Sequence, residues 1–187
     1  MSKIEYLDNL KYFVLKCDRC SLHKTKNNYV FGEGSLNSKI MFIGEAPGKN
    51  EDIYGKPFVG RAGKIFDDCL VSIGLDRNDI YISNILKCRP PKNRNPLKKE
   101  IKSCSEYIDK QIDIIKPNLI IPLGRISISY IFNKFKFPFQ KINRIHGKIY
   151  SKNNLKIIPI YHPAAVIYNN KLKEILFEDF KIIEKFI

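Results

Sequence analysis

Residues 39–63 read KIMFIGEAPGKNEDIYGKPFVGRAG, and this stretch indicates the class of fold. Residues 39–43, apolar from Ile40 to Ile43, form a short run that is broken by Gly44, as expected of a buried β-strand. Gly, Pro and charged residues follow as far as Gly60, which predicts a loop, and residues 61–73 then have a helical pattern. A buried strand, a loop rich in Gly and Pro, and a helix in this order are typical of α/β proteins.

The same alternation continues along the chain. Helices are predicted at residues 5–15, 97–115, 124–131 and 171–187, and further strands at 79–86, 118–124, 148–150 and 156–161. We expect an α/β fold, a three-layer α/β/α sandwich whose central sheet is mainly parallel and four-stranded. Because no linker, repeat or low-complexity segment interrupts the 187 residues, we expect residues 1–187 to form one domain.

Three loops at the predicted carboxyl ends of strands are candidates for a functional site. They follow Ile43, Leu86 and Tyr161. The second loop reads CRPPKNRNP at residues 88–96, where two adjacent prolines exclude a helix. In open α/β sheets ligands bind at the carboxyl ends of the strands, so we expect these loops to meet at one site.

The charge of the chain indicates a polyanionic partner. Its 33 Lys and Arg residues exceed its 19 Asp and Glu residues, which gives a formal net charge of +14. A Lys-rich surface without a functional role would produce the same imbalance, so charge alone does not decide between the two. No segment has the roughly 18 apolar residues of a membrane span, and we expect an intracellular protein, of cytoplasm or nucleoid, with no membrane partner.

Four of the five cysteines form a pattern that suits metal binding. Cys17 and Cys20 are a C-x2-C pair, and Cys88 and Cys104 follow far downstream. In a reducing compartment such a set indicates metal ligands, and its spacing fits either zinc or a four-iron four-sulfur cluster, with four unrelated cysteines as the alternative. A metal there would anchor a basic loop against DNA phosphates. Cys69, inside a helical pattern, is predicted to be a buried free thiol.

Two common nucleotide-binding motifs are absent from the first loop. A Walker phosphate loop ending at residues 63–64 needs Gly where Phe58 stands and Ser or Thr where Ile65 stands. The Gly pattern of dinucleotide-binding folds does not follow the first strand either. The loop therefore indicates another kind of site.

Three motifs together resemble the family 4 uracil-DNA glycosylases, the iron-sulfur branch of the uracil-DNA glycosylase superfamily. They are GEAPGKNEDIYGKPFVGRAG at 44–63, SNILKCRPPKNRNP at 83–96 and HPAA at 162–165, and the resemblance covers nearly the whole chain. It implies a monofunctional enzyme that flips uracil out of DNA and hydrolyses its N-glycosidic bond, which leaves an abasic site in base excision repair. We expect a monomer, although no residue pattern decides the oligomeric state. It also implies a 4Fe-4S cluster rather than zinc.

The resemblance also implies roles for individual residues. Phe58 would stack on the flipped uracil, Asn84 would hydrogen-bond its amide edge, and His162 would lie over the base. The implied catalytic residues are His162, Glu45 and Glu51, and no definite general base is assigned. The implied uracil-binding residues are Gly44, Glu45, Ala46, Phe58, Asn84 and His162; the DNA-binding residues are Arg61, Arg89, Asn93 and Arg94; the cluster ligands are Cys17, Cys20, Cys88 and Cys104.

Two positions depart from the family pattern. Tyr168 and His146 stand where the family commonly has Arg. Two other functions stay open at this point: a non-catalytic DNA-binding module of the same fold, and a protein that traps uracil-DNA covalently through His146.

Overall fold

The computed structural model describes residues 2–187, and a six-stranded sheet lies at its centre. Four parallel strands form the middle of the sheet, in the order β3 (Tyr81–Asn84), β2 (Ile40–Gly44), β4 (Leu119–Pro122) and β6 (Leu155–Ile157). The edge strands β1 (Glu33–Gly34) and β5 (Tyr150–Lys152) pair antiparallel with β3 and β6. The sheet is therefore mixed and mostly parallel, as predicted, but the expectation of four strands is wrong.

The two edge strands have simple physical origins, and β5 overlaps the strand predicted at 148–150. β1 is two residues long, too short for any alternation of polar and apolar residues to show it in the sequence. β5 turns back onto β6 through Asn153, whose positive φ of 53° suits a tight hairpin. Each pairs antiparallel at an edge and leaves the parallel centre of the sheet unchanged.

Strand β2 is buried on both faces, as its continuous apolar run predicts. Met41 and Ile43 belong to one hydrophobic core, and Ile40 and Phe42 belong to the core on the opposite face of the sheet. Successive side chains of a strand point to opposite faces, so one short strand contributes to both cores.

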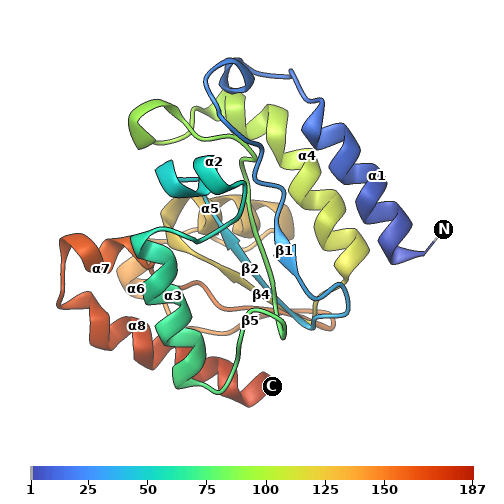
Figure 1. The fold of residues 1–187 in the computed structure, drawn as a ribbon. Helices are drawn as coiled ribbons and strands as arrows, with labels where there is room; N and C mark the ends of the chain where they lie inside the picture. Colours follow the sequence, from blue (N-terminus) through green and yellow to red (C-terminus); the bar gives the residue numbers. More distant parts are fainter. Residues whose placement is uncertain (1) are drawn as a thin grey trace.

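Helices cover both faces of the sheet (Figure 1). One core includes residues of α1 (Lys3–Leu15), α4 (Lys98–Ile115), α5 (Gly124–Phe135) and α6 (Ile142–Ile145). The other includes residues of α3 (Arg61–Ser72), α7 (Ala164–Tyr168) and α8 (Leu172–Lys181). The predicted helices are confirmed, and α6 and α7 are short additions that the sequence pattern did not indicate.

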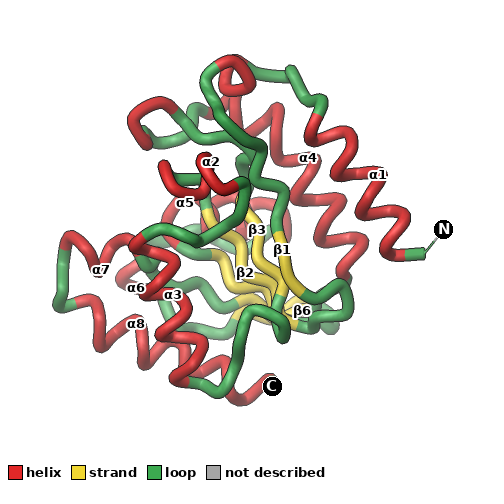
Figure 2. The backbone as a smooth tube through the Cα atoms, viewed as in Figure 1, coloured by secondary structure: helices red, strands yellow, loops and turns green. Residues whose placement is uncertain are grey.

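The loops at the carboxyl ends of the central strands contain short helices of their own (Figure 2). The segment after β2, expected to be a loop, contains α2 (Lys49–Tyr54). The segment after β3 is irregular, as the prolines predict, apart from one 3-10 turn at Pro91–Asn93. Further 3-10 turns lie at Ser21–Lys24 and Ile182–Phe186.

Among the described residues, no helix has the length and apolar character needed to cross a membrane.

Replacing Phe42 with Ala should lower the free energy of unfolding by about 3–5 kcal/mol, because it leaves a cavity in a packed core. The Phe42 side chain is fully buried and its ring contacts those of Phe66 and Phe180. Denaturant unfolding of the purified protein measures the change. Val71→Ala on α3 is the control: this side chain is 71% exposed, so its loss should change the stability by less than about 0.5 kcal/mol. Equal losses in the two variants would contradict the assignment of the core.

Candidate active-site cleft and cysteine cavity

The three predicted loops meet at the carboxyl ends of the central strands and form a cleft of about 530 Å³. Its lining includes most of the residues that the sequence singled out, namely Glu45, Ala46, Glu51, Phe58, Arg61, Asn84, Asn93, Arg94 and His162. Gly44 lies beside Asn84 in the sheet, whereas Arg89 is not part of the lining. A cleft of this size can hold a small ligand such as a nucleobase.

Asn84 is the buried polar residue of the cleft, with 2% of its surface exposed. It is the last residue of β3 and pairs with Gly44 of β2. A Cβ atom on residue 44 would overlap the Asn84 carboxamide and lie 2.9 Å from the Phe58 ring. Within residues 2–187 no group hydrogen-bonds the Asn84 carboxamide. Buried amides normally have partners, so this one is available for a ligand.

Phe58 places an aromatic ring against the same region of the cleft. Its backbone has a positive φ of 53°, which is unusual for a bulky residue. The guanidinium of Arg77 donates to the carbonyl oxygens of Pro57 and Phe58 and holds this conformation. A Cβ atom at Gly63 would collide with the Phe58 carbonyl, which explains why the motif has Gly there.

His162 stacks on Phe58, with ring centroids 5.5 Å apart and planes at 22°. The backbone N–H of Ala164 donates to Nδ1 of His162 over 3.1 Å. Burial lowers the pKa of His162 to about 4. At neutral pH the ring is therefore uncharged, with Nδ1 as the acceptor and the proton on Nε2, from which it can donate to a ligand.

The two candidate glutamates are placed differently. Glu51 Oε1 accepts hydrogen bonds from the backbone N–H groups of Val59 and Gly60, at 2.9 and 2.7 Å, so this carboxylate holds the turn before α3. The Glu45 carboxylate has no hydrogen-bond partner among the described residues, and Glu45 lines the cleft. Burial raises the pKa of Glu45, and the charge of Arg125 opposes that shift.

The two arginines of the loop after β3 are held by hydrogen bonds within the protein. Arg94 forms hydrogen bonds of 2.9 and 2.6 Å with the two carboxylate oxygens of Glu100, whose side chain is fully buried. Arg89 Nε donates to Asn93 Oδ1 over 2.7 Å. Arg61 is exposed at the cleft and forms no ion pair within residues 2–187. These contacts give the loop a defined shape despite its lack of regular structure.

Cys17, Cys20, Cys88 and Cys104 line a second cavity, separate from the cleft. Within residues 2–187 no three His, Cys, Asp or Glu side chains are arranged to hold a single metal ion. The backbone N–H of Lys87 donates to the Cys104 sulfur over 3.3 Å.

The prediction for Cys69 is confirmed: it is a buried free thiol of α3, and burial raises its pKa to about 12.

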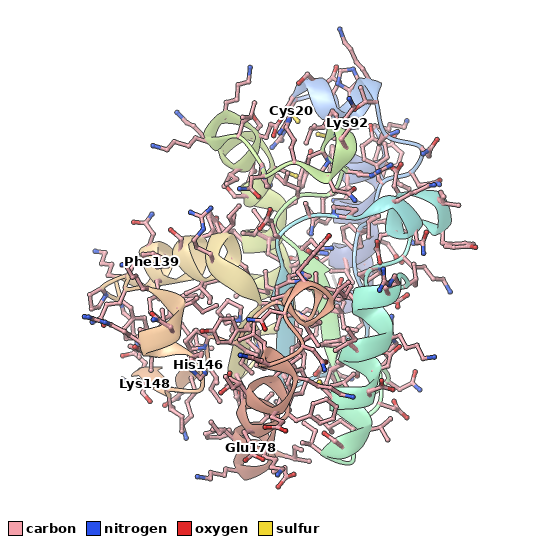
Figure 3. All side chains as sticks on the ribbon, turned by 90° about the vertical axis from the view of Figure 1, so that its left-hand side faces the viewer. Cys20, Lys92, Phe139, His146, Lys148 and Glu178 are labelled. Atoms are coloured by element: carbon pink, nitrogen blue, oxygen red, sulfur yellow. The ribbon has the colours of Figure 1, made fainter. Side chains whose placement is uncertain are left out.

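The two departures from the family pattern lie in different environments. His146 is not part of the cleft lining; its Nδ1 lies 3.0 Å from both carboxylate oxygens of Asp179, and Figure 3 shows it far from Cys20. Tyr168 is at the edge of the cleft and is 89% exposed.

Sequence reasoning missed Arg77, which supports Phe58, and Lys87, which contacts both β3 and Cys104. Arg77 lies between Asp76 and Asn78 in a polar turn, and nothing local distinguishes it from a surface residue. The partners of both residues are set by the tertiary fold. No signal in a single sequence would have identified either role.

We expect the His162 ring to stay neutral from pH 8 down to about pH 5, because burial lowers its pKa. Its protonated form should appear only as the pH falls towards 4, well below the usual range for histidine. Long-range ¹H–¹⁵N spectra of labelled protein measure this, with a protonated Nε2 and an unprotonated Nδ1 as the expected signature. Variants of the partly buried His23 and His146 assign the signals, and a His162 titration near pH 6.5 would contradict the expectation.

Residues 31–181 match the Uracil DNA glycosylase superfamily. The type-4 uracil-DNA glycosylase of Archaeoglobus fulgidus is 48% identical over 184 residues, which cover 96% of this chain and 92% of that protein. The type-4 enzymes of Saccharolobus solfataricus and Thermotoga maritima are 46% and 38% identical, over 97% and 98% of this chain and 87% and 95% of theirs. Because these alignments span nearly the full chain, the protein belongs to the type-4 family of the uracil-DNA glycosylase superfamily.

Proposed function

We propose that the protein is a monofunctional uracil-DNA glycosylase, which flips uracil out of DNA and hydrolyses its N-glycosidic bond. The product would be an abasic site, an intermediate of base excision repair. The observation that carries this proposal is that Asn84, Phe58 and His162 meet in one cleft, with the Asn84 carboxamide unpaired. We take residues 1–187 as one domain that acts as a monomer.

Asn84 suits the recognition of uracil. Its carboxamide can donate to a carbonyl oxygen and accept from the adjacent imide N–H, whereas cytosine presents an amino group and an unprotonated nitrogen there. A buried polar group left unpaired costs about 1–3 kcal/mol, so this contact should reject cytosine by roughly tenfold to a hundredfold. Phe58 provides an aromatic surface that offsets part of the cost of unstacking the base. Gly44 and Ala46, beside these residues, complete the proposed base-binding region.

His162 suits the cleavage step. Breaking the glycosidic bond leaves positive charge on the sugar and negative charge on the departing uracil. A neutral imidazole with its proton on Nε2 can donate to a uracil oxygen as that negative charge develops. Glu45 is better placed than Glu51 to orient the attacking water or the sugar, because the Glu51 carboxylate already accepts two backbone hydrogen bonds.

DNA is the proposed partner, and its phosphates fit the net charge of +14. Arg61 lies exposed at the cleft and is the direct candidate for a phosphate contact. Arg89, Asn93 and Arg94 are held by contacts within their loop, so this group would present DNA with a preformed surface. A chromosomal substrate places the reaction inside the cell, in cytoplasm or nucleoid.

The cysteine cavity fits a 4Fe-4S cluster better than zinc. A structural zinc site holds four ligands at about 2.0–2.3 Å from one point, and no three side chains of residues 2–187 converge in that way. Four cysteines nevertheless line one cavity, as cluster ligands spread over several iron atoms would. When bound, the cluster would supply iron–thiolate bonds that tie the end of α1, the 88–96 loop and α4 together.

The structure gives no support to covalent trapping through His146. The ring is paired with Asp179 of α8 and lies outside the cleft lining. A denaturing gel tests this alternative, because a covalent protein–DNA adduct that disappears in His146→Ala would establish it.

Cluster-loaded protein should release uracil from a labelled oligonucleotide, so that alkali then breaks the strand at that position. His162→Ala should slow this reaction about a hundredfold to a thousandfold, the usual effect of removing one preorganised donor to a developing anion. Single-turnover rates measure the change. His146→Ala is the matched control and should keep the parent rate. Intact DNA after incubation with the cluster-loaded parent protein would favour the non-catalytic binding module instead.

Cys104→Ala should abolish cluster binding, because the remaining three thiolates leave one iron without its cysteine ligand. Iron content and the visible absorption of the purified protein measure the loss. Cys69→Ala is the matched control, since Cys69 is a buried thiol outside the cavity, and it should keep full iron content. Stoichiometric zinc in the parent protein, or an equal loss of iron in both variants, would refute the proposed ligand set.

A further inference from the structure

Lys87 is a buried lysine that lies between the cleft and the cysteine cavity. Only 1% of its surface is exposed. Its Nζ donates to Ser83 Oγ over 2.7 Å, to the Asn84 backbone oxygen over 2.8 Å and to Gln111 Oε1 over 2.7 Å. These three acceptors match the three N–H bonds of an ammonium group. Such a complete set of partners holds the side chain in one position.

The Lys87 Nζ hydrogen bond satisfies the Asn84 carbonyl oxygen at a position where no neighbouring strand pairs with β3. Ile85 N–H donates to the Gly44 oxygen, so by the alternation of a parallel ladder the Asn84 carbonyl faces away from β2. On that side β1 pairs with Tyr81 and Ile82 and does not reach Asn84. Lys87 supplies the donor that a longer β1 would have provided.

The charge of Lys87 has no carboxylate partner. Within residues 2–187 no Asp or Glu oxygen lies within ion-pair distance of its Nζ, although burying an unpaired ammonium group is costly. Lys87 does line the cavity of the four cysteines, and its backbone N–H donates to the Cys104 sulfur. With a cluster bound, the cysteines would be thiolates and would place negative charge near this buried amine.

We propose that Lys87 is a positioning residue that fixes the Asn84 peptide and so aims the Asn84 carboxamide at the base. The backbone N–H of Lys87 donates to the Cys104 sulfur, and its side chain donates to the Asn84 backbone oxygen at the end of β3. Lys87 therefore connects the cysteine cavity to the proposed base-binding cleft. This inference rests on the proposed function, because it assumes that Asn84 contacts the base.

Lys87 would act as a fixed support for the Asn84 peptide and would not move during the reaction. The Asn84 side chain has few rotatable bonds, so a shift of its peptide shifts the carboxamide by a similar amount. Misplacing a recognition group by about 1 Å can reduce the rate a hundredfold. A variant without the Lys87 amine should therefore recognise uracil poorly even though every residue that touches the base is present.

A double-mutant cycle of Lys87→Met with Asn84→Ala tests the proposal. Two quantities are measured on cluster-loaded protein: the affinity for free uracil by calorimetry, and the single-turnover rate of uracil release. Lys87→Met should reduce both by about tenfold in the parent protein and by less than about twofold in Asn84→Ala, because the effect acts through Asn84. Iron content per chain should be the same in all four proteins.

Ser83→Ala is the matched control, because it removes one partner of Lys87 and keeps the bond to the Asn84 carbonyl. It should change uracil affinity by less than about twofold. The proposal would be overturned if Lys87→Met reduced uracil affinity and rate equally in the parent protein and in Asn84→Ala. It would also be overturned if Lys87→Met reduced neither quantity in the parent protein. Lys87→Gln enters the same cycle if the Met variant does not fold, and failure of both to fold would assign Lys87 to stability instead.

The proposed function fails separately. Parent protein that neither binds uracil nor releases it from DNA would contradict the glycosylase assignment. Parent protein that does both, loses both in Asn84→Ala and keeps both in Lys87→Met would contradict the role of Lys87 alone.

Discussion

The close approach of Gly44 to Asn84 and Phe58 is the constraint on which the cleft depends. The parallel register of β2 and β3 places Gly44 and Asn84 side by side at the ends of their strands. Because residue 44 has no Cβ atom, the carboxamide and the ring can both occupy the space above it. The buried hydrophobic runs of two strands thus determine where one polar and one aromatic side chain meet.

Three carboxylates stabilise the backbone of the loops that form the cleft. Asp52 accepts hydrogen bonds from the backbone N–H groups of Asn27 and Asn28, Glu51 from those of Val59 and Gly60, and Glu100 from that of Leu97. Each holds a loop that has few ladder hydrogen bonds of its own. Asn84 and His162 Nε2 keep their hydrogen-bonding capacity for a ligand, because other residues satisfy the loops. Because His162 is a neutral donor, it adds no buried positive charge to that of Lys87 near the cleft.

The parts of the fold that sequence predicts are those with a local pattern. The apolar run of β2 and the helical spacing of α3 are visible in the sequence. The three loops can be placed at one edge of the sheet because parallel strands run in the same direction. β1 escapes prediction because its two residues are defined by pairing with β3 alone. The candidate site follows the same division. Most motif residues could be assigned a role from the sequence, whereas Arg77, outside the motifs, and Lys87, inside the second one, act on Phe58 and Asn84 through contacts that exist only after folding. The pairing of Arg94 with Glu100 was missed for the same reason, and it shows that Arg94 also supports its own loop.

The cysteine cavity lies apart from the cleft, yet the chain joins the two at short range. The residues from Asn84 to Cys88 pass from the base-binding cleft to a proposed cluster ligand within a single loop, and Lys87 bonds at both ends of that segment. On the other side, α4 carries Cys104 and, one turn earlier, Glu100, which anchors Arg94. An irregular, Pro-rich segment has no ladder to hold it, so metal–thiolate bonds at Cys88 and Cys104 would restrict it from both ends. A structural metal centre can in this way set the precision of base recognition without taking part in bond cleavage.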